Sequence, residues 1–109
     1  MKEFGLVRRA ALFSIRVREH LSAYKYNALL IDDLRQLIRS SGAIGANYIE
    51  ANQHLGTKDF KMRIKIAKKE AAEAAYWAEI LSEITKDEIF KTFQSGAREL
   101  ELILGSIQK

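Results

Sequence analysis

Apolar residues recur along this chain at steps of three and four, which is the period of an amphipathic α-helix. Four stretches carry such a stripe. The first runs from about Glu3 to Tyr24, and the second from about Ala28 to His54. The third begins after Thr57 and reaches Ile84, and the fourth continues to about Ile107. The pattern therefore predicts four long helices.

The predicted connections are short and carry turn or capping residues. Tyr26 and Asn27 join the first two helices, and Gly56 and Thr57 join the second and third, with Thr57 as the expected N-cap. The run Thr85-Lys-Asp-Glu88 has the spacing of a capping box before the fourth helix. Short connections make sequential helices antiparallel. We predict an all-α, up-down-up-down four-helix bundle that forms a single domain over residues 1–109.

The second predicted helix has an unusual middle, in which the side chains are small. Its repeating face is expected to hold Leu30, Leu34, Leu37, Ser41, Ile44, Tyr48 and Leu55. Between these, Gly42 and Gly45 stand among alanines and serines. Glycine inside a helix costs up to about 1 kcal/mol relative to alanine, so we expect close packing of a neighbouring helix to compensate.

Composition agrees with this fold and narrows the chemistry. The 109 residues include no proline, which favours uninterrupted helices, and no cysteine, which removes disulfides and thiolate metal sites. We therefore expect a reducing, cytoplasmic setting. No apolar run is long enough to cross a membrane, and the first residues lack a signal-peptide pattern. A net charge of +4 permits an anionic partner without requiring one.

The third predicted helix is basic in its first half and acidic in its second. The spacing of Lys58, Lys61, Lys65 and Lys68 places them on one exposed face. Such a row is either an ordinary solvated surface or a ridge of cations that binds a phosphate backbone. Aromatic residues for stacking are not interleaved with it, which argues against sequence-specific reading of bases. Arginines on the first helix form a second candidate group for binding nucleic acid, namely Arg8, Arg9 and Arg16.

The third helix also carries a second apolar stripe beside the one that faces the core. Its members are Met62, Ile66, Glu73, Trp77, Ile80 and Ile84. A bundle needs one apolar stripe per helix, and monomers rarely expose a further contiguous patch. We therefore expect an interface between copies of the chain, with Trp77 as its anchor. The alternative is that Trp77 completes the core of its own bundle.

Polar residues near the hairpin of the second and third helices could hold a ligand or simply fix the packing. Asn47 and Glu50 should lie near Lys65, Lys68 and Lys69. We expect Glu50 to pair with one of these lysines and Asn47 to bond across the bundle, since buried polar groups need partners. A ligand-binding role is the alternative.

Several classes of site lack the residues that they need. A di-iron bundle uses two Glu-x-x-His pairs, but the residues three positions before His20 and His54 are Val17 and Ala51. We therefore expect no metal. Glu50, Glu70 and Glu73 could serve acid–base catalysis, but nothing supplies a nucleophile motif or a phosphate loop. We expect no catalytic residues, no cofactor, no small-molecule substrate and no enzyme activity.

The hairpin resembles a known family. Its segments are Arg39-Ser-Ser-Gly-Ala-Ile-Gly-Ala-Asn-Tyr-Ile-Glu50, Asp59-Phe60, Ile66-Ala-Lys-Lys-Glu-Ala, Glu73 and Tyr76-Trp77. They resemble the bacterial four helix bundle proteins, also called 23S rRNA intervening-sequence proteins, over essentially the whole chain. Two positions depart from the family pattern: Ala43, where serine is common, and Ala51, where glycine is. The resemblance implies that Asn47, Glu50, Lys69 and Glu70 are structural residues of the motif.

The same resemblance implies an antiparallel bundle that assembles into a ring-shaped homopentamer without enzyme activity. It is similar to the accessory proteins of diversity-generating retroelements, which bind nucleic acid through basic surfaces. Two hypotheses follow for function. The first is a homo-oligomer that binds RNA or DNA through its basic faces. The second is a protein–protein scaffold in which the lysines only confer solubility. Salt dependence of binding to RNA separates the two.

Overall fold

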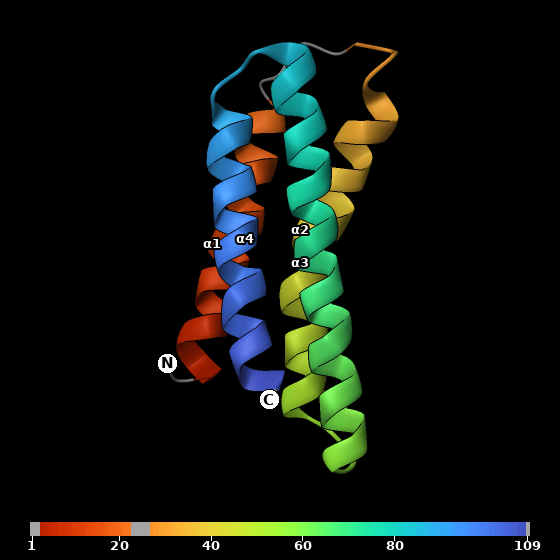
Figure 1. The fold of residues 1–109 in the computed structure, drawn as a ribbon, viewed down its shortest axis with the longest axis vertical. Coiled ribbons are helices and arrows are strands. Elements are labelled where there is room, and N and C mark those ends of the chain that lie inside the picture. Colours follow the sequence, from red (N-terminus) through yellow and green to blue (C-terminus); the bar gives the residue numbers. More distant parts are fainter. Residues whose placement is uncertain (1–2, 23–26, 109) are drawn as a thin grey trace.

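A computed structural model describes residues 3–22 and 27–108. It contains helices α1 (Glu3–Ser22), α2 (Ile31–Asn52), α3 (Thr57–Thr85) and α4 (Ile89–Gln108). Figure 1 shows the four helices side by side, each antiparallel to the one before it. The predicted all-α four-helix bundle is confirmed, and the described residues contain no strand. The predicted end of the first helix at Tyr24, and Tyr26 in the connection, lie outside the described residues.

The bundle is elongated, with extents of 44 × 22 × 20 Å. α3 packs most closely, against α2 on one side and α4 on the other. α1 packs mainly on α2. Its contact with α4 is smaller than the contacts of α1 with α2, of α2 with α3 and of α3 with α4. α3 is therefore the central packing element, and α1 lies diagonally across the bundle from it.

The core explains why α3 packs so tightly. Its inward face is built largely from alanine, and Ala67, Ala71, Ala74, Ala75 and Ala78 are all 0 % exposed. Small side chains let the backbones of both neighbouring helices come close. Larger side chains from the other helices fill the remaining space, among them Leu6, Phe13, Val17, Leu37, Ile44, Tyr48, Phe90, Phe93, Leu100 and Leu104.

The small face of α2 packs against α1. A Cβ atom added at Gly45 would lie 3.2 Å from the Cβ of Ala10, closer than ordinary van der Waals contact. Ser41 of α2 and Ser14 of α1 are buried and share a hydrogen bond of 3.0 Å between their hydroxyls. The close approach expected from the glycines is therefore present, and α1 is the neighbour.

Two expectations at the hairpin between α2 and α3 are wrong. Leu55 is 96 % exposed, because α2 ends at Asn52 and the chain turns before reaching this position. Thr57 is the first residue of α3, and Gly56 is the N-cap. Gly56 has φ +146°, a conformation that residues with a side chain rarely adopt, so the turn requires glycine here. Asp59 completes the turn because its carboxylate accepts a hydrogen bond from the Leu55 amide at 3.1 Å.

The predicted capping box before α4 is also wrong. Thr85 is still part of α3, and its hydroxyl donates to the Leu81 carbonyl oxygen at 2.7 Å. Lys86 then adopts a left-handed conformation with φ 61°, which ends α3. Asp87 provides the cap that Thr85 was expected to give, because its Oδ1 accepts a hydrogen bond from the Ile89 amide at 3.1 Å. The cap is thus displaced by two residues from the predicted position.

Candidate functional site

The lysine row lies on the side of α3 that borders α4. Lys58, Lys61 and Lys65 are exposed, and Lys68 is partly buried. The side chain of Lys68 lies over Gly105 of α4, where an added Cβ would be 3.6 Å from the lysine Cε. At the hairpin end, the row borders an open hollow of about 780 Å³ that includes the exposed side chains of Leu55 and Met62. The predicted row therefore exists as one basic surface.

The arginines of α1 form a separate surface, because α1 is diagonal to α3. Arg8 and Arg16 are exposed. Arg9 pairs with Glu99 of α4, with 3.2 Å between Nη2 and Oε1. Arg9 and Arg16 both line a groove of about 310 Å³ between α1 and α4, whose floor includes Phe13 and Phe93. The structure therefore does not bring the two predicted basic groups together.

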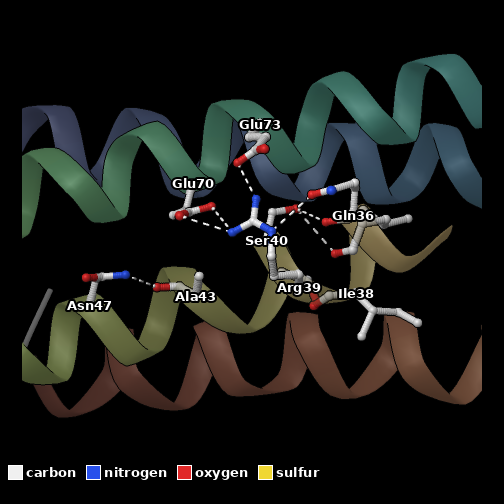
Figure 2. A network of polar contacts seen from close by, with 10 residues as sticks. Gln36, Ile38, Arg39, Ser40, Ala43, Asn47, Glu70 and Glu73 are labelled. Carbon is white, nitrogen blue, oxygen red and sulfur yellow. Dashed lines mark hydrogen bonds and ion pairs between the residues drawn. The ribbon is translucent and has the colours of Figure 1, made fainter. Parts of the chain in front are cut away.

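A polar network links α2 to α3 on the opposite side of the hairpin (Figure 2). Arg39 of α2 extends toward α3 and contacts two carboxylates one turn apart. Its Nη1 lies 3.1 Å from Oε1 of Glu70, and its Nη2 lies 2.5 Å from Oε2 of Glu73. Its Nε donates to the side-chain oxygen of Gln36 at 3.0 Å. Two of the guanidinium nitrogens therefore link α2 to α3, and the third forms a hydrogen bond within α2.

The network shifts the pKa values of its members in opposite directions. Burial, together with hydrogen bonding to Glu73, raises the pKa of Glu70 despite the neighbouring Arg39. Burial also acts to raise the pKa of Glu73, but hydrogen bonds from Arg39 and Glu70 and the charge of Arg39 outweigh it, so this pKa is lowered. The hydrogen bond with Glu73 raises the pKa of Arg39 further. Glu70 and Glu73 thus serve as paired anchors for one cation.

The residues assigned to the family motif have local roles. Asn47 donates a hydrogen bond to the Ala43 carbonyl oxygen of its own helix at 2.9 Å, so the expected bond across the bundle is wrong (Figure 2). Glu50 is exposed and forms no ion pair with the described lysines, which corrects the second half of that expectation. Lys69 is exposed at the outer face of α3. Glu70 is the motif residue that bridges two helices.

The second apolar stripe is partly covered by the bundle itself. Met62 and Ile84, at its two ends, are 49 % and 58 % exposed. Ile66, Trp77 and Ile80 are half-buried, and Trp77 packs against the core. The indole Nε1 of Trp77 is buried and has no acceptor in hydrogen-bond geometry among the described residues. The indole nevertheless lies close enough to Glu73 to contribute to the lowering of its pKa. Trp77 therefore belongs to its own core as well as to the stripe.

Sequence reasoning missed Arg39 as the residue that organises this side of the hairpin. Folding the hairpin at Thr57 places Arg39 opposite the turn that carries Glu70 and Glu73, so an arginine facing two acids one turn apart was a usable signal. It also missed Phe90, which is completely buried. Among the described residues no group of three or more metal-ligating side chains is arranged to hold an ion. None of the described helices is long and apolar enough to cross a bilayer.

Comparison with known proteins places the chain. The family model described as "23S rRNA-intervening sequence protein" matches residues 3–106. The chain belongs to this family. A solved structure from Bacteroides thetaiotaomicron, described as a protein of unknown function from the S23 ribosomal protein family, is 28 % identical with a TM-score of 0.83. The match covers 95 % of this chain and 98 % of that one. No curated protein matches the chain.

Membership in the 23S rRNA-intervening sequence family agrees with the resemblance seen in the hairpin sequence. The high TM-score shows that the related crystal structure shares the whole bundle rather than one helix pair. The related protein has no established function. The role of this member of the family therefore has to be argued from its own surfaces.

Proposed function

We propose that this protein is a non-enzymatic, homo-oligomeric bundle that binds the phosphate backbone of RNA or DNA through the lysine row of α3. One observation carries the proposal. Lys58, Lys61 and Lys65 project from a single side of a rigid helix, are exposed, and have no ion-pair partner among the described residues. Cations held on a ridge in this way release counterions when they meet a polyanion.

The surroundings of the row favour binding without sequence preference. The nearest exposed apolar side chains are Leu55 and Met62, and neither is an aromatic platform on which a base can stack. Reading bases also requires polar side chains that reach the base edges, whereas lysines mainly contact phosphates. We therefore propose backbone binding in the cytoplasm, the reducing compartment that suits a chain without cysteine.

Self-assembly, as a homopentameric ring, is the second part of the proposal. Met62 and Ile84 leave the ends of the apolar stripe about half exposed on each copy. Repeated head-to-tail contacts in a closed ring would cover the stripe on every subunit. Several lysine rows on one assembly would also raise the affinity for a long polyanion, because the second contact becomes intramolecular.

Binding of a labelled single-stranded RNA over a range of salt concentrations tests this function. If three or four phosphates are neutralised, the logarithm of the affinity should fall with the logarithm of salt with a slope of about −2 to −3. Lys61→Gln/Lys65→Gln should weaken binding and flatten the slope by about 1.4. The matched control is Lys86→Gln/Lys91→Gln, which removes the same charge from exposed positions at the far end of α3 and on α4.

The alternative is a protein–protein scaffold, which the exposed ends of the apolar stripe favour. If no RNA binding is seen even at low salt, the protein–protein scaffold replaces backbone binding as the function. Equal losses in the two double variants would show that binding follows net charge rather than the lysine row.

A further inference from the structure

One row of α3 carries opposite charges in its two halves. Lys61 and Lys65 lie near the start of the helix, and Glu79 and Glu83 lie near its end. All four are exposed, and none of them has an ion-pair partner among the described residues. Ala72 lies midway between the two halves. Helical spacing puts all five on the side of α3 that borders α4.

We propose that this row binds a second copy of the chain, with the two α3 helices antiparallel about a two-fold axis at Ala72. In such a pair, residues equally far from the axis along the helix face each other. Lys61 and Glu83 are each eleven positions from Ala72, and Lys65 and Glu79 are each seven positions from it. Lys61 therefore meets the partner's Glu83, and Lys65 meets the partner's Glu79. The symmetry repeats both ion pairs.

The centre of the row is shaped for close approach. Ala72 has the small side chain that the crossing point of two helices needs, and it lies in a shallow hollow of about 150 Å³ beside Glu101 of α4. Next to it on α4 is Leu102, whose side chain is 75 % exposed. An axis at Ala72 brings Leu102 near its own copy and removes both from water. Tyr76, which is 54 % exposed, falls opposite the partner's Lys68.

The charges of the row favour the antiparallel orientation of the two helices, and the small side chain of Ala72 favours the register centred on it. A parallel pair would place lysine against lysine and glutamate against glutamate, which is unfavourable. Sliding one copy by a helical turn could pair Lys65 with the partner's Glu83. That register sets the bulky Tyr76 against Ala72 near the axis. It also places Lys61 opposite Asp87, which lies beyond the end of α3 and pairs with His20 of its own chain. The arrangement centred on Ala72 satisfies both lysines and keeps the small residue at the crossing point.

This surface is distinct from the apolar stripe proposed for the ring. The stripe lies toward α2, where Trp77 packs beside the Arg39 network, whereas Lys65 and Ala72 border Glu101 of α4. The contact also involves the glutamates of α3, which have no part in binding phosphate. Its existence therefore does not depend on the proposed function.

Two charge-reversal variants test the contact by sedimentation velocity in the absence of RNA. One is Lys61→Glu/Lys65→Glu, and the other is Glu79→Lys/Glu83→Lys. The parent should show a larger mass at about 50 mM salt than at about 500 mM, because the contact depends on exposed ion pairs. Each variant alone should lose this salt-dependent association, with a self-association constant weakened at least tenfold. An equimolar mixture of the two should regain it.

Recovery in the mixture would show that the opposite charges meet between chains. Lys65 and Glu79 are about 21 Å apart along one helix at 1.5 Å per residue, so they do not pair within a chain. A mixture that stays dissociated, or a parent whose mass does not change with salt, would overturn the proposal. Leu102→Asp should also abolish this association, and an association unchanged by Leu102→Asp would contradict an axis at Ala72. Glu79→Lys/Glu83→Lys keeps every lysine of the row, so it should lose self-association while retaining RNA binding. Failure of either proposal is thus seen separately.

Discussion

Arg39 is the residue whose contacts most directly tie two helices together on the outer face of the bundle. Arg39→Gln removes the cation while keeping a polar side chain, and leaves Glu70 and Glu73 facing each other. We expect a loss of about 1 kcal/mol in the free energy of unfolding at pH 7. This magnitude already allows for solvent screening, since the side chains of Arg39 and Glu73 are 46 % and 40 % exposed. Urea unfolding followed by circular dichroism measures it.

The loss of unfolding free energy in Arg39→Gln should be smaller in acid. The direction of this change follows from the pKa shifts of Glu70 and Glu73. The lowered pKa of Glu73 means that its stabilisation is present above its ordinary pKa and disappears as the pH falls through the lowered value. The raised pKa of Glu70 acts in the opposite sense, since its ionised form is disfavoured in the fold and protonation relieves that cost. At about pH 3.5 the variant should therefore differ less from the parent. A loss of the same size at both pH values would contradict this account, and Arg35→Gln, an exposed arginine on the same helix, is the control.

Single residues were also where sequence reasoning was least reliable. The apolar spacing identified buried positions such as Val17 and Leu100 because burial follows helical period. It did not identify Asp87 as the cap of α4, because Thr85 could either end one helix or begin the next. Its hydroxyl donates to the Leu81 carbonyl oxygen and accepts from the Asp87 amide at 3.1 Å, so it closes the end of α3 rather than capping α4. Folding the hairpin at Thr57 brings Arg39 to the level of Glu70 and Glu73, but the atoms that it contacts depend on the rotation of the two helices about their axes, which a single sequence does not specify.

At the scale of helices, the contact between α1 and α2 depends on the absence of side chains at the glycines of α2. Gly45→Leu would insert a branched side chain where even a Cβ lies 3.2 Å from Ala10. We expect overpacking to lower the free energy of unfolding by about 1–3 kcal/mol or more. Thermal or urea unfolding measures the change. Ala46→Leu, at the neighbouring exposed position, should have little effect, and a Gly45→Leu variant as stable as the parent would show that α1 yields at this point.

The helices themselves were predicted well because their stripes are long and their connections short. Each predicted boundary lies within a few residues of the observed one where the structure describes it. The errors are at turns, as with Leu55, which continued the apolar spacing of α2 although the helix had already ended at Asn52. Periodicity alone does not reveal where a helix stops, since the stopping point depends on backbone conformation and local hydrogen bonds.

For the whole molecule, the apolar stripe of α3 predicts assembly. The structure refines the choice of variant, because Trp77 packs against its own core and its removal would also weaken the fold. Ile84 is 58 % exposed, so Ile84→Asp should leave the bundle folded and release smaller species, as seen by light scattering at moderate salt. Ile15→Asp places the same change on α1, at a position 43 % exposed, and serves as the control. A parent protein that already runs at its 12.4 kDa monomer mass would contradict the assembly.

The sequence identified the residues of the candidate surfaces but not the positions of these surfaces around the bundle. The sequence grouped the lysines of α3 with the arginines of α1 because both are basic. Only the order of helices around the bundle shows that Arg16 and Lys65 lie on different sides. Surface function depends on such neighbours in space, whereas the core depends mainly on spacing along the chain.

The contact of α1 with the rest of the bundle is smaller than that of α3, and this difference affects local unfolding. α3 is enclosed by close packing against both neighbours, while α1 rests on the small face of α2 and leaves a groove against α4. Free energy of local opening follows the amount of packing that must be broken. We therefore expect the backbone amides of α1 to exchange with solvent faster than those of α3 when hydrogen exchange is measured.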